Sequence, residues 1–189
     1  MPVFLDFEAS SLGERSYPIE VGWVFADGAG EAHLIRPAPE WTDWDPAAER
    51  IHGIGRGQLM ATGTPYGEVA RRMVEALTGH DLCASAPSWD GKWLSALLRA
   101  AGFPRGTLRL RDSDAVFAEA ARAILAPAIR PERLEAAVAD TVALSELREK
   151  SGPPAHRALA DAEAERQQWL RVSRAAQAAA ARLEAQREP

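Results

Sequence analysis

The segment Val3-Phe4-Leu5-Asp6-Phe7-Glu8-Ala9-Ser10-Ser11-Leu12-Gly13 sets the organisation of this chain. An apolar run of strand type leads into two carboxylates at positions i and i+2, and small residues follow directly. Because side chains alternate along a strand, Asp6 and Glu8 point to the same face, roughly 7 Å apart. Such carboxylates repel each other and are costly to desolvate unless a hard divalent cation holds both through oxygen. The alternative is a strand-end aspartate followed by a glutamate that opens a solvated turn.

The composition is that of an ordinary globular protein. The 189 residues suit one domain, which would bury roughly 70% of its unfolded surface, and 47% of them are hydrophobic and 26% charged. The net charge of -5 argues against a protein that coats DNA, but it does not exclude an enzyme whose carboxylates are neutralised locally by metal.

The cysteine content and the absence of long apolar segments narrow the class further. Cys83 is the only cysteine, which excludes a disulfide framework and a thiolate metal cluster, and its apolar surroundings predict a buried structural role. The N-terminus is not basic, and no apolar stretch reaches about 18 residues. We therefore expect a cytoplasmic protein.

Alternating and helical periodicities predict a mixed α/β chain. Strands are expected at 3–9, 18–26, 31–36, 81–85 and 107–110, the first three as an antiparallel meander, and helices at 46–51, 64–78, 90–101, 113–125, 132–150 and 159–185. A turn is expected at 87–89. Glu20 is a charge within a strand otherwise built for burial. It either accepts hydrogen bonds near the metal site or lies on a sheet edge.

Two further acidic positions and a histidine lie downstream. Asp90 falls at the start of a predicted helix, where an N-cap is its ordinary role. His156 and Asp161 are five residues apart, and the preceding segment Gly152-Pro153-Pro154 places His156 in a loop and Asp161 in the first turns of the last helix. This arrangement suits a metal ligand paired with a mobile general base. The alternative is a loop histidine beside a helix-start aspartate favoured by the helix dipole.

The glycine-rich segment His52-Gly53-Ile54-Gly55-Arg56-Gly57 does not predict a dinucleotide-binding loop. Gln58 stands where that fingerprint needs glycine, and no strand precedes the segment. His52 is therefore either a structural histidine or a contact near a substrate phosphate.

Taken in order, these motifs resemble the DEDDh family of 3′–5′ exonucleases, the DnaQ-like group that includes oligoribonuclease and RNase T. The resemblance covers residues 3 to about 170. It rests on five segments: Phe4-Leu5-Asp6-Phe7-Glu8-Ala9-Ser10-Ser11-Leu12, Pro18-Ile19-Glu20-Val21-Gly22, Ile51-His52-Gly53-Ile54, Trp89-Asp90-Gly91-Lys92-Trp93-Leu94 and His156-Arg157-Ala158-Leu159-Ala160-Asp161-Ala162. The chain departs from the family at Ser85-Ala86, where His-Asn is usual, at Pro87, and at Ala9, where threonine is usual.

The resemblance implies an RNase H-like three-layer fold. It consists of a five-stranded mixed sheet, with strands one to three antiparallel, flanked by helices and followed by a long C-terminal helix. We expect residues 1–189 to form a single exonuclease domain, with about 172–189 as a helical extension.

The implied activity is metal-dependent 3′–5′ hydrolysis of phosphodiester bonds at single-stranded ends, with two Mg²⁺ or Mn²⁺ ions. Asp6, Glu8 and Asp161 would bind metal directly and Asp90 directly or through water, while His156 would accept the proton of the attacking water. The expected substrate contacts are Leu12 and Trp89 against bases, together with Ser11 and His52. A core position is the alternative for Trp89.

Other functions remain open from sequence. A fold-sharing protein that holds nucleic-acid ends without cutting, or a phosphohydrolase acting on free nucleotides, would fit parts of the pattern. The lack of a G-x-S-x-G motif argues against a Ser-His-Asp hydrolase. The sequence does not separate RNA from DNA, and family analogy favours a homodimer.

Overall fold

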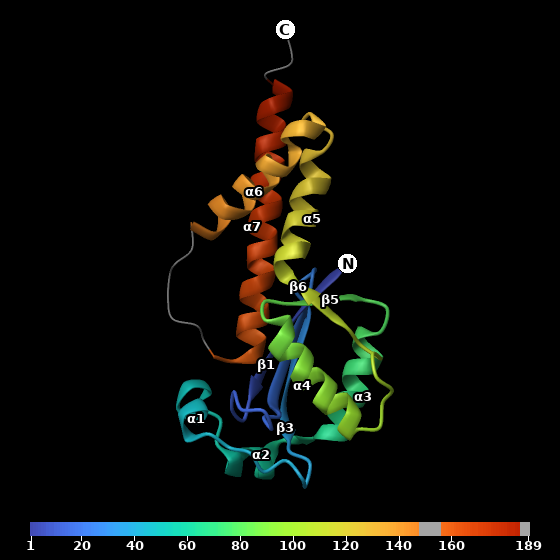
Figure 1. The fold of residues 1–189 in the computed structure, drawn as a ribbon, viewed down its shortest axis with the longest axis vertical. Coiled ribbons are helices and arrows are strands. Elements are labelled where there is room, and N and C mark those ends of the chain that lie inside the picture. Colours follow the sequence, from blue (N-terminus) through green and yellow to red (C-terminus); the bar gives the residue numbers. More distant parts are fainter. Residues whose placement is uncertain (148–155, 186–189) are drawn as a thin grey trace.

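The computed structural model describes residues 1–147 and 156–185 (Figure 1). In this part of the chain six strands form one sheet in the order β4-β3-β2-β1-β5-β6. The strands are β1 (Pro2–Ala9), β2 (Pro18–Phe25), β3 (Gly30–Arg36), β4 (Thr64–Pro65), β5 (Asp81–Ala84) and β6 (Leu110–Asp112). Strands β1 to β3 are antiparallel, whereas β4, β5 and β6 pair in parallel with β3, β1 and β5.

Helices lie on both faces of the sheet (Figure 1). They are α1 (Pro46–His52), α2 (Arg56–Thr62), α3 (Tyr66–Leu77), α4 (Pro87–Ala100), α5 (Ser113–Leu125), α6 (Pro131–Leu147) and α7 (Ala158–Ala185). None of these described helices is both long and apolar enough to cross a membrane. The predicted α/β class, the antiparallel meander and the long last helix are confirmed.

The alternation of β1 divides the core into two clusters. Val3, Leu5 and Phe7 pack with residues of α3 and α4. Phe4 packs on the other side with Cys83 and with residues of α5, α6 and α7. Asp6 and Glu8 share the parity of Phe4, so β1 presents both carboxylates to the face that α7 covers.

Four details differ from the sequence-based expectation. The strand expected at 107–110 begins only at Leu110, because a turn occupies the preceding residues, with Thr107 N–H donating to the carbonyl of Pro104 at 3.3 Å. The segment 87–89 is the first turn of α4 rather than a separate turn, since a proline at the first helical position gives up no needed N–H. Strand β4 and helix α2 were not expected, and the predicted helix end at 148–150 lies outside the described residues.

The first turn of α7 lies directly on β2. A Cβ atom added to Gly22 would stand 2.3 Å from the backbone nitrogen of Leu159 and 2.5 Å from its Cα. Gly22 pairs with Asp6 on β1. The missing side chain of Gly22 therefore brings the start of the last helix close to the carboxylates of the first strand.

Candidate metal centre

The two carboxylates of β1 meet the first helical turns of α7. Oxygen atoms of Asp6, Glu8 and Asp161 all lie within 4.8 Å of one another. Asp161 is anchored by its own helix start, because its Oδ2 accepts the backbone N–H of Arg157 at 3.2 Å. The structure thus brings together three of the four carboxylates that the sequence singled out.

Asp90 approaches the same centre from the first turn of α4. Its side chain is almost fully buried, and its Oδ2 makes no hydrogen bond within the described residues. Asp90 is not the N-cap, which is Ala86. A buried carboxylate oxygen without a partner is costly, so this atom is suited to a ligand that the described residues do not provide.

The centre holds more negative charge than its surroundings neutralise. Burial raises the pKa of Asp6 to about 9, and the charges of Asp90 and Glu8 add to the effect. Burial likewise raises the pKa of Glu8 to about 7, with the charge of Asp161 next in importance. The pKa of Asp90 also rises to about 7, through burial and then the charge of Glu165. Clustered carboxylate oxygens with raised pKa values fit a hard divalent cation, which favours their ionised forms.

Glu165 is a fifth carboxylate at this site, and the sequence analysis missed it. It lies one helical turn beyond Asp161 on α7, and its Oε1 accepts the backbone N–H of Ser85 at 2.8 Å. The hydroxyl of Ser113 donates to its Oε2. Burial raises the pKa of Glu165, while the hydrogen bonds from Ser113 and Ser85 act in the opposite direction. The i, i+4 spacing from Asp161 was a signal that could have identified it.

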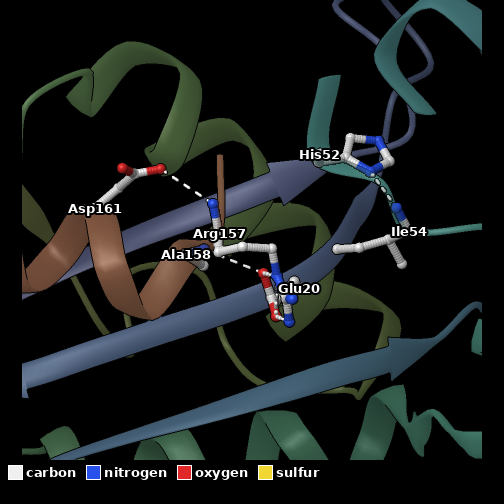
Figure 2. Close-up of polar contacts among 6 residues, drawn as sticks. All are labelled: Glu20, His52, Ile54, Arg157, Ala158 and Asp161. Atoms are coloured by element: carbon white, nitrogen blue, oxygen red, sulfur yellow. Dashed lines mark hydrogen bonds and ion pairs between the residues drawn. The ribbon is translucent and has the colours of Figure 1, made fainter. Parts of the chain in front are cut away.

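Glu20 serves the site indirectly. It lies on the interior strand β2, so the sheet-edge alternative is wrong. Its Oε2 accepts the Nε–H of Arg157 at 3.0 Å and the backbone N–H of Ala158 at 3.0 Å, and Nη2 of Arg157 donates to Oε1 at 2.5 Å (Figure 2). This clamp fixes the residue that follows His156. His156 itself has a left-handed backbone, with φ of 48°.

His52 has one ring nitrogen engaged and one without a partner. Nδ1 accepts the backbone N–H of Ile54 at 3.0 Å (Figure 2), so in the neutral ring the proton is on Nε2. Nε2 makes no hydrogen bond within the described residues, although only 6% of the residue is exposed. Burial lowers the pKa of His52, opposed by the charge of Glu49. His52 is therefore both structural and equipped with a spare donor.

The other predicted substrate contacts lie just after β1, at Ser11 and Leu12, and in the first turn of α4, at Trp89. Leu12 is 71% exposed and Trp89 is 38% exposed, so the fully buried alternative for Trp89 is wrong. The Trp89 ring lies 5.6 Å from that of Trp93 and has the Nζ of Lys92 5.0 Å from its centroid. Ser11 is buried, and its hydroxyl already donates to Asp43.

Comparison with solved structures shows that this fold is similar to that of exonuclease I. The chain is similar to E. coli exonuclease I in complex with a dA16 oligonucleotide, with a TM-score of 0.64 and 16% identity over 95% of this chain and 42% of that one. The zinc-bound form of the E. coli ExoI–ssDNA complex gives a TM-score of 0.61 and 18% identity over 88% and 38% of the two chains. A further exonuclease I structure gives a TM-score of 0.60 and 18% identity over 88% of this chain and 39% of that one.

These similarities establish the fold, which is the RNase H-like arrangement of exonuclease I. The chain spans about two fifths of the length of those proteins. No protein-family model matches it, and no curated protein does.

Proposed function

We propose that this protein is a metal-dependent 3′–5′ exonuclease that hydrolyses phosphodiester bonds at the ends of single-stranded nucleic acid. The observation that carries the proposal is the convergence of Asp6, Glu8 and Asp161 around one point, with the unpartnered oxygen of buried Asp90 beside it. The shared fold with exonuclease I, whose solved complexes contain single-stranded DNA, supports the same class of substrate.

Asp6, Glu8 and Asp161 would hold divalent cations, Mg²⁺ or Mn²⁺, and Asp90 would join them directly or through water. When two such ions are bound, they neutralise the anionic phosphate, favour an ionised attacking water and stabilise the leaving 3′ oxygen. The carboxylates must be ionised to do this, and the raised pKa values of Asp6, Glu8 and Asp90 make cation binding and proton release one linked event.

His156 would accept the proton of the attacking water. Its position follows from its neighbour, because Arg157 is tied to buried Glu20 and leaves His156 at the entry of α7, five residues before Asp161. Its left-handed backbone conformation is uncommon for a residue other than glycine and fits a side chain placed for chemistry.

Nε2–H of His52 would donate to a phosphate oxygen, and the exposed side chains of Leu12 and Trp89 would contact the terminal bases. Ser11 would contribute through its backbone and through its link to Asp43. We further propose that residues 1–189 act as one cytoplasmic exonuclease domain, with about 172–189 as a helical extension, and that the protein forms a homodimer.

A time course on labelled oligonucleotides tests the proposal. Single-stranded RNA and DNA of equal sequence, labelled at the 5′ end, are incubated with the protein in Mn²⁺, Mg²⁺ or EDTA. We expect a metal-dependent ladder that shortens from the 3′ end, and a loss of more than about 100-fold in rate for Asp6→Asn. The relative rates identify the preferred nucleic acid.

Two outcomes would contradict it. Intact oligonucleotides that bind tightly under every metal condition would identify a protein that holds ends without cutting. Hydrolysis of mononucleotide esters with no shortening of oligonucleotides would identify a nucleotide phosphohydrolase.

A further inference from the structure

Glu165 is a partly buried acidic side chain for which the four-carboxylate centre gives no role. It is absent from the set of oxygens that lie within 4.8 Å of one another, which is formed by Asp6, Glu8 and Asp161. Its charge nevertheless acts on both Asp6 and Asp90. It therefore stands beside the centre rather than among its closest ligands.

Both oxygens of Glu165 hold groups from other elements. Oε1 accepts the backbone N–H of Ser85, which follows β5, at 2.8 Å, and Oε2 accepts the hydroxyl of Ser113, the first residue of α5. Both donors are uncharged, so these contacts bring no positive charge to the carboxylate. Their common effect is geometric, because one side chain of α7 joins the end of β5 and the start of α5.

The contact with Ser85 bears directly on Asp90. The N-cap of α4 is Ala86, which has no side chain able to cap the helix, and Ser85 immediately precedes it. The backbone N–H of Asp90 donates to the carbonyl of Ala86 at 3.0 Å. A fixed Ser85 therefore fixes the first turn of α4, and with it the direction of the Asp90 carboxylate. In this chain Ser85-Ala86 stands where the resembling exonucleases usually carry His-Asn, so the turn lacks the side chains usual at that point.

We propose that Glu165 is a positioning residue that fastens the β5–α4 turn to α7, so that Asp90 and Asp161 face the same point. This inference rests on the proposed nuclease function. The residue acts as a hydrogen-bond acceptor for Ser85 and Ser113, and its negative charge is not what the positioning requires.

Two substitutions separate these contributions. Glu165→Gln keeps an oxygen that can accept from Ser85 N–H, and its amide can donate to the Ser113 hydroxyl, while the charge is lost. Glu165→Ala removes both contacts. Glu163→Ala is the matched control, because Glu163 lies on the same helix and accepts from Arg166 and Gln167 instead. Ser113→Ala removes one contact only and provides a second variant if Glu165→Ala folds poorly.

The experiment measures cleavage of single-stranded DNA with Mn²⁺ and, separately, hydrogen exchange of the Ser85 amide without metal or DNA. We expect Glu165→Ala to lower kcat by about 10- to 100-fold and to speed exchange at Ser85 by at least about tenfold. Ser113→Ala should give a kcat and a Ser85 exchange rate between those of Glu165→Ala and the unaltered protein. Glu165→Gln should stay within about threefold of the unaltered protein in both kcat and Ser85 exchange rate. The control Glu163→Ala should match the unaltered protein in both.

The proposal is overturned if Glu165→Gln is as slow as Glu165→Ala, since the charge would then be the essential feature. It is also overturned if Glu165→Ala leaves both kcat and the exchange of Ser85 unchanged. A failure of the nuclease function itself would look different. The unaltered protein would then not cut DNA under any metal condition, while exchange at Ser85 would still report whether Glu165 holds the turn.

Discussion

Two groups of acidic side chains meet at strands β1 and β2, and their surroundings differ. Glu20 on β2 is paired in register with Glu8 on β1. Glu20 accepts hydrogen bonds from Nε and Nη2 of the Arg157 guanidinium and from one backbone N–H, that of Ala158. Glu8 instead lies close to Asp6 and Asp161, and one oxygen of nearby Asp90 has no hydrogen-bond partner among residues 1–147 and 156–185.

The difference shows which of the two groups has its negative charge compensated by other residues of the protein. Burial of a charge is tolerated when opposite charge and hydrogen bonds replace the lost water. Glu20 meets that condition, so it stabilises the start of α7 without any external ligand. The carboxylate centre does not meet it, as the raised pKa values of Asp6, Glu8 and Asp90 show. The carboxylate centre therefore lacks compensating positive charge, which under the proposed function a divalent cation would supply. Glu20 already has such charge from Arg157.

The most damaging single change should be one that disturbs both groups at once. Gly22→Ala inserts a methyl group against the backbone of Leu159, at the start of the helix that carries Asp161 and is clamped by Glu20. We expect a loss of about 3 kcal/mol in the free energy of unfolding, and a fall in cleavage rate of at least about 100-fold as Asp161 moves. Urea unfolding and the labelled-oligonucleotide assay measure the two effects.

The control for this change is another glycine. Gly67→Ala lies in helix α3, where an added Cβ meets no atom within 4 Å. It should raise stability by about 0.5–1 kcal/mol, because alanine favours the helix, and leave cleavage unchanged. Equal behaviour of the two variants would show that the close approach at Gly22 does not hold the site together.

Removing the Arg157 guanidinium should leave Glu20, like the carboxylate centre, without compensating positive charge. Arg157→Ala leaves Glu20 buried with only the N–H of Ala158. Loss of one partner from a buried pair costs about 3–5 kcal/mol, and because 53% of the Arg157 side chain is exposed we expect about 2 kcal/mol.

The comparison would be wrong if Arg157→Ala unfolded at the same urea concentration as the unaltered protein. Arg157→Gln, which can restore one hydrogen bond, should recover part of the loss. Cleavage should fall in both variants because His156 precedes Arg157, with the smaller fall in Arg157→Gln.

Much of this architecture could be predicted from local pattern. The alternation in Val3–Ala9 placed Asp6 and Glu8 on one face, and the position of Asp161 in the first turns of its helix followed from the diproline before His156. These features depend on periodicity and on short-range chain stiffness, which a sequence expresses directly.

The remainder depends on contacts between distant segments. Glu165 interacts with Ser85 across 80 positions and with Ser113 across 52, and Glu20 with Arg157 across 137. The sequence shows that Glu20 is an unusual charge within a strand, but it does not show that Arg157 is the residue that pairs with it. It likewise shows the Asp161–Glu165 spacing but not that Ser85 lies within reach.

Solution pH should affect the carboxylate centre. In the metal-free protein Asp6, with a pKa of about 9, and Glu8 and Asp90, with pKa values of about 7, keep protons that the unfolded chain releases above about pH 4. The folded state then binds more protons, so the free energy of unfolding falls as pH rises from about 4 to about 9. Mg²⁺ competes with those protons, and its stabilising effect should grow over the same interval.

Thermal unfolding near pH 6 and near pH 8.5, each with EDTA or Mg²⁺, measures this. We expect the gain in Tm from Mg²⁺ to be larger by at least about 3 °C at the higher pH. Asp6→Asn should remove most of the pH dependence above pH 7. A Tm in EDTA that does not change with pH would contradict the raised pKa values of these three carboxyl groups.

The smallest effect is expected for Leu12, whose substitution changes neither the carboxylate centre nor Glu20. Leu12 follows Glu8 by four residues and is 71% exposed, so Leu12→Ala should change the free energy of unfolding by less than about 0.5 kcal/mol. If this side chain covers a terminal base, its loss should cost about 1 kcal/mol of binding, or about fivefold in KM, with kcat nearly unchanged. Leu144→Ala on α6, another exposed leucine at 61%, is the control and should leave KM alone. Equal KM values for the two variants would remove Leu12 from the substrate site and leave the carboxylate centre and the Glu20 clamp as they are.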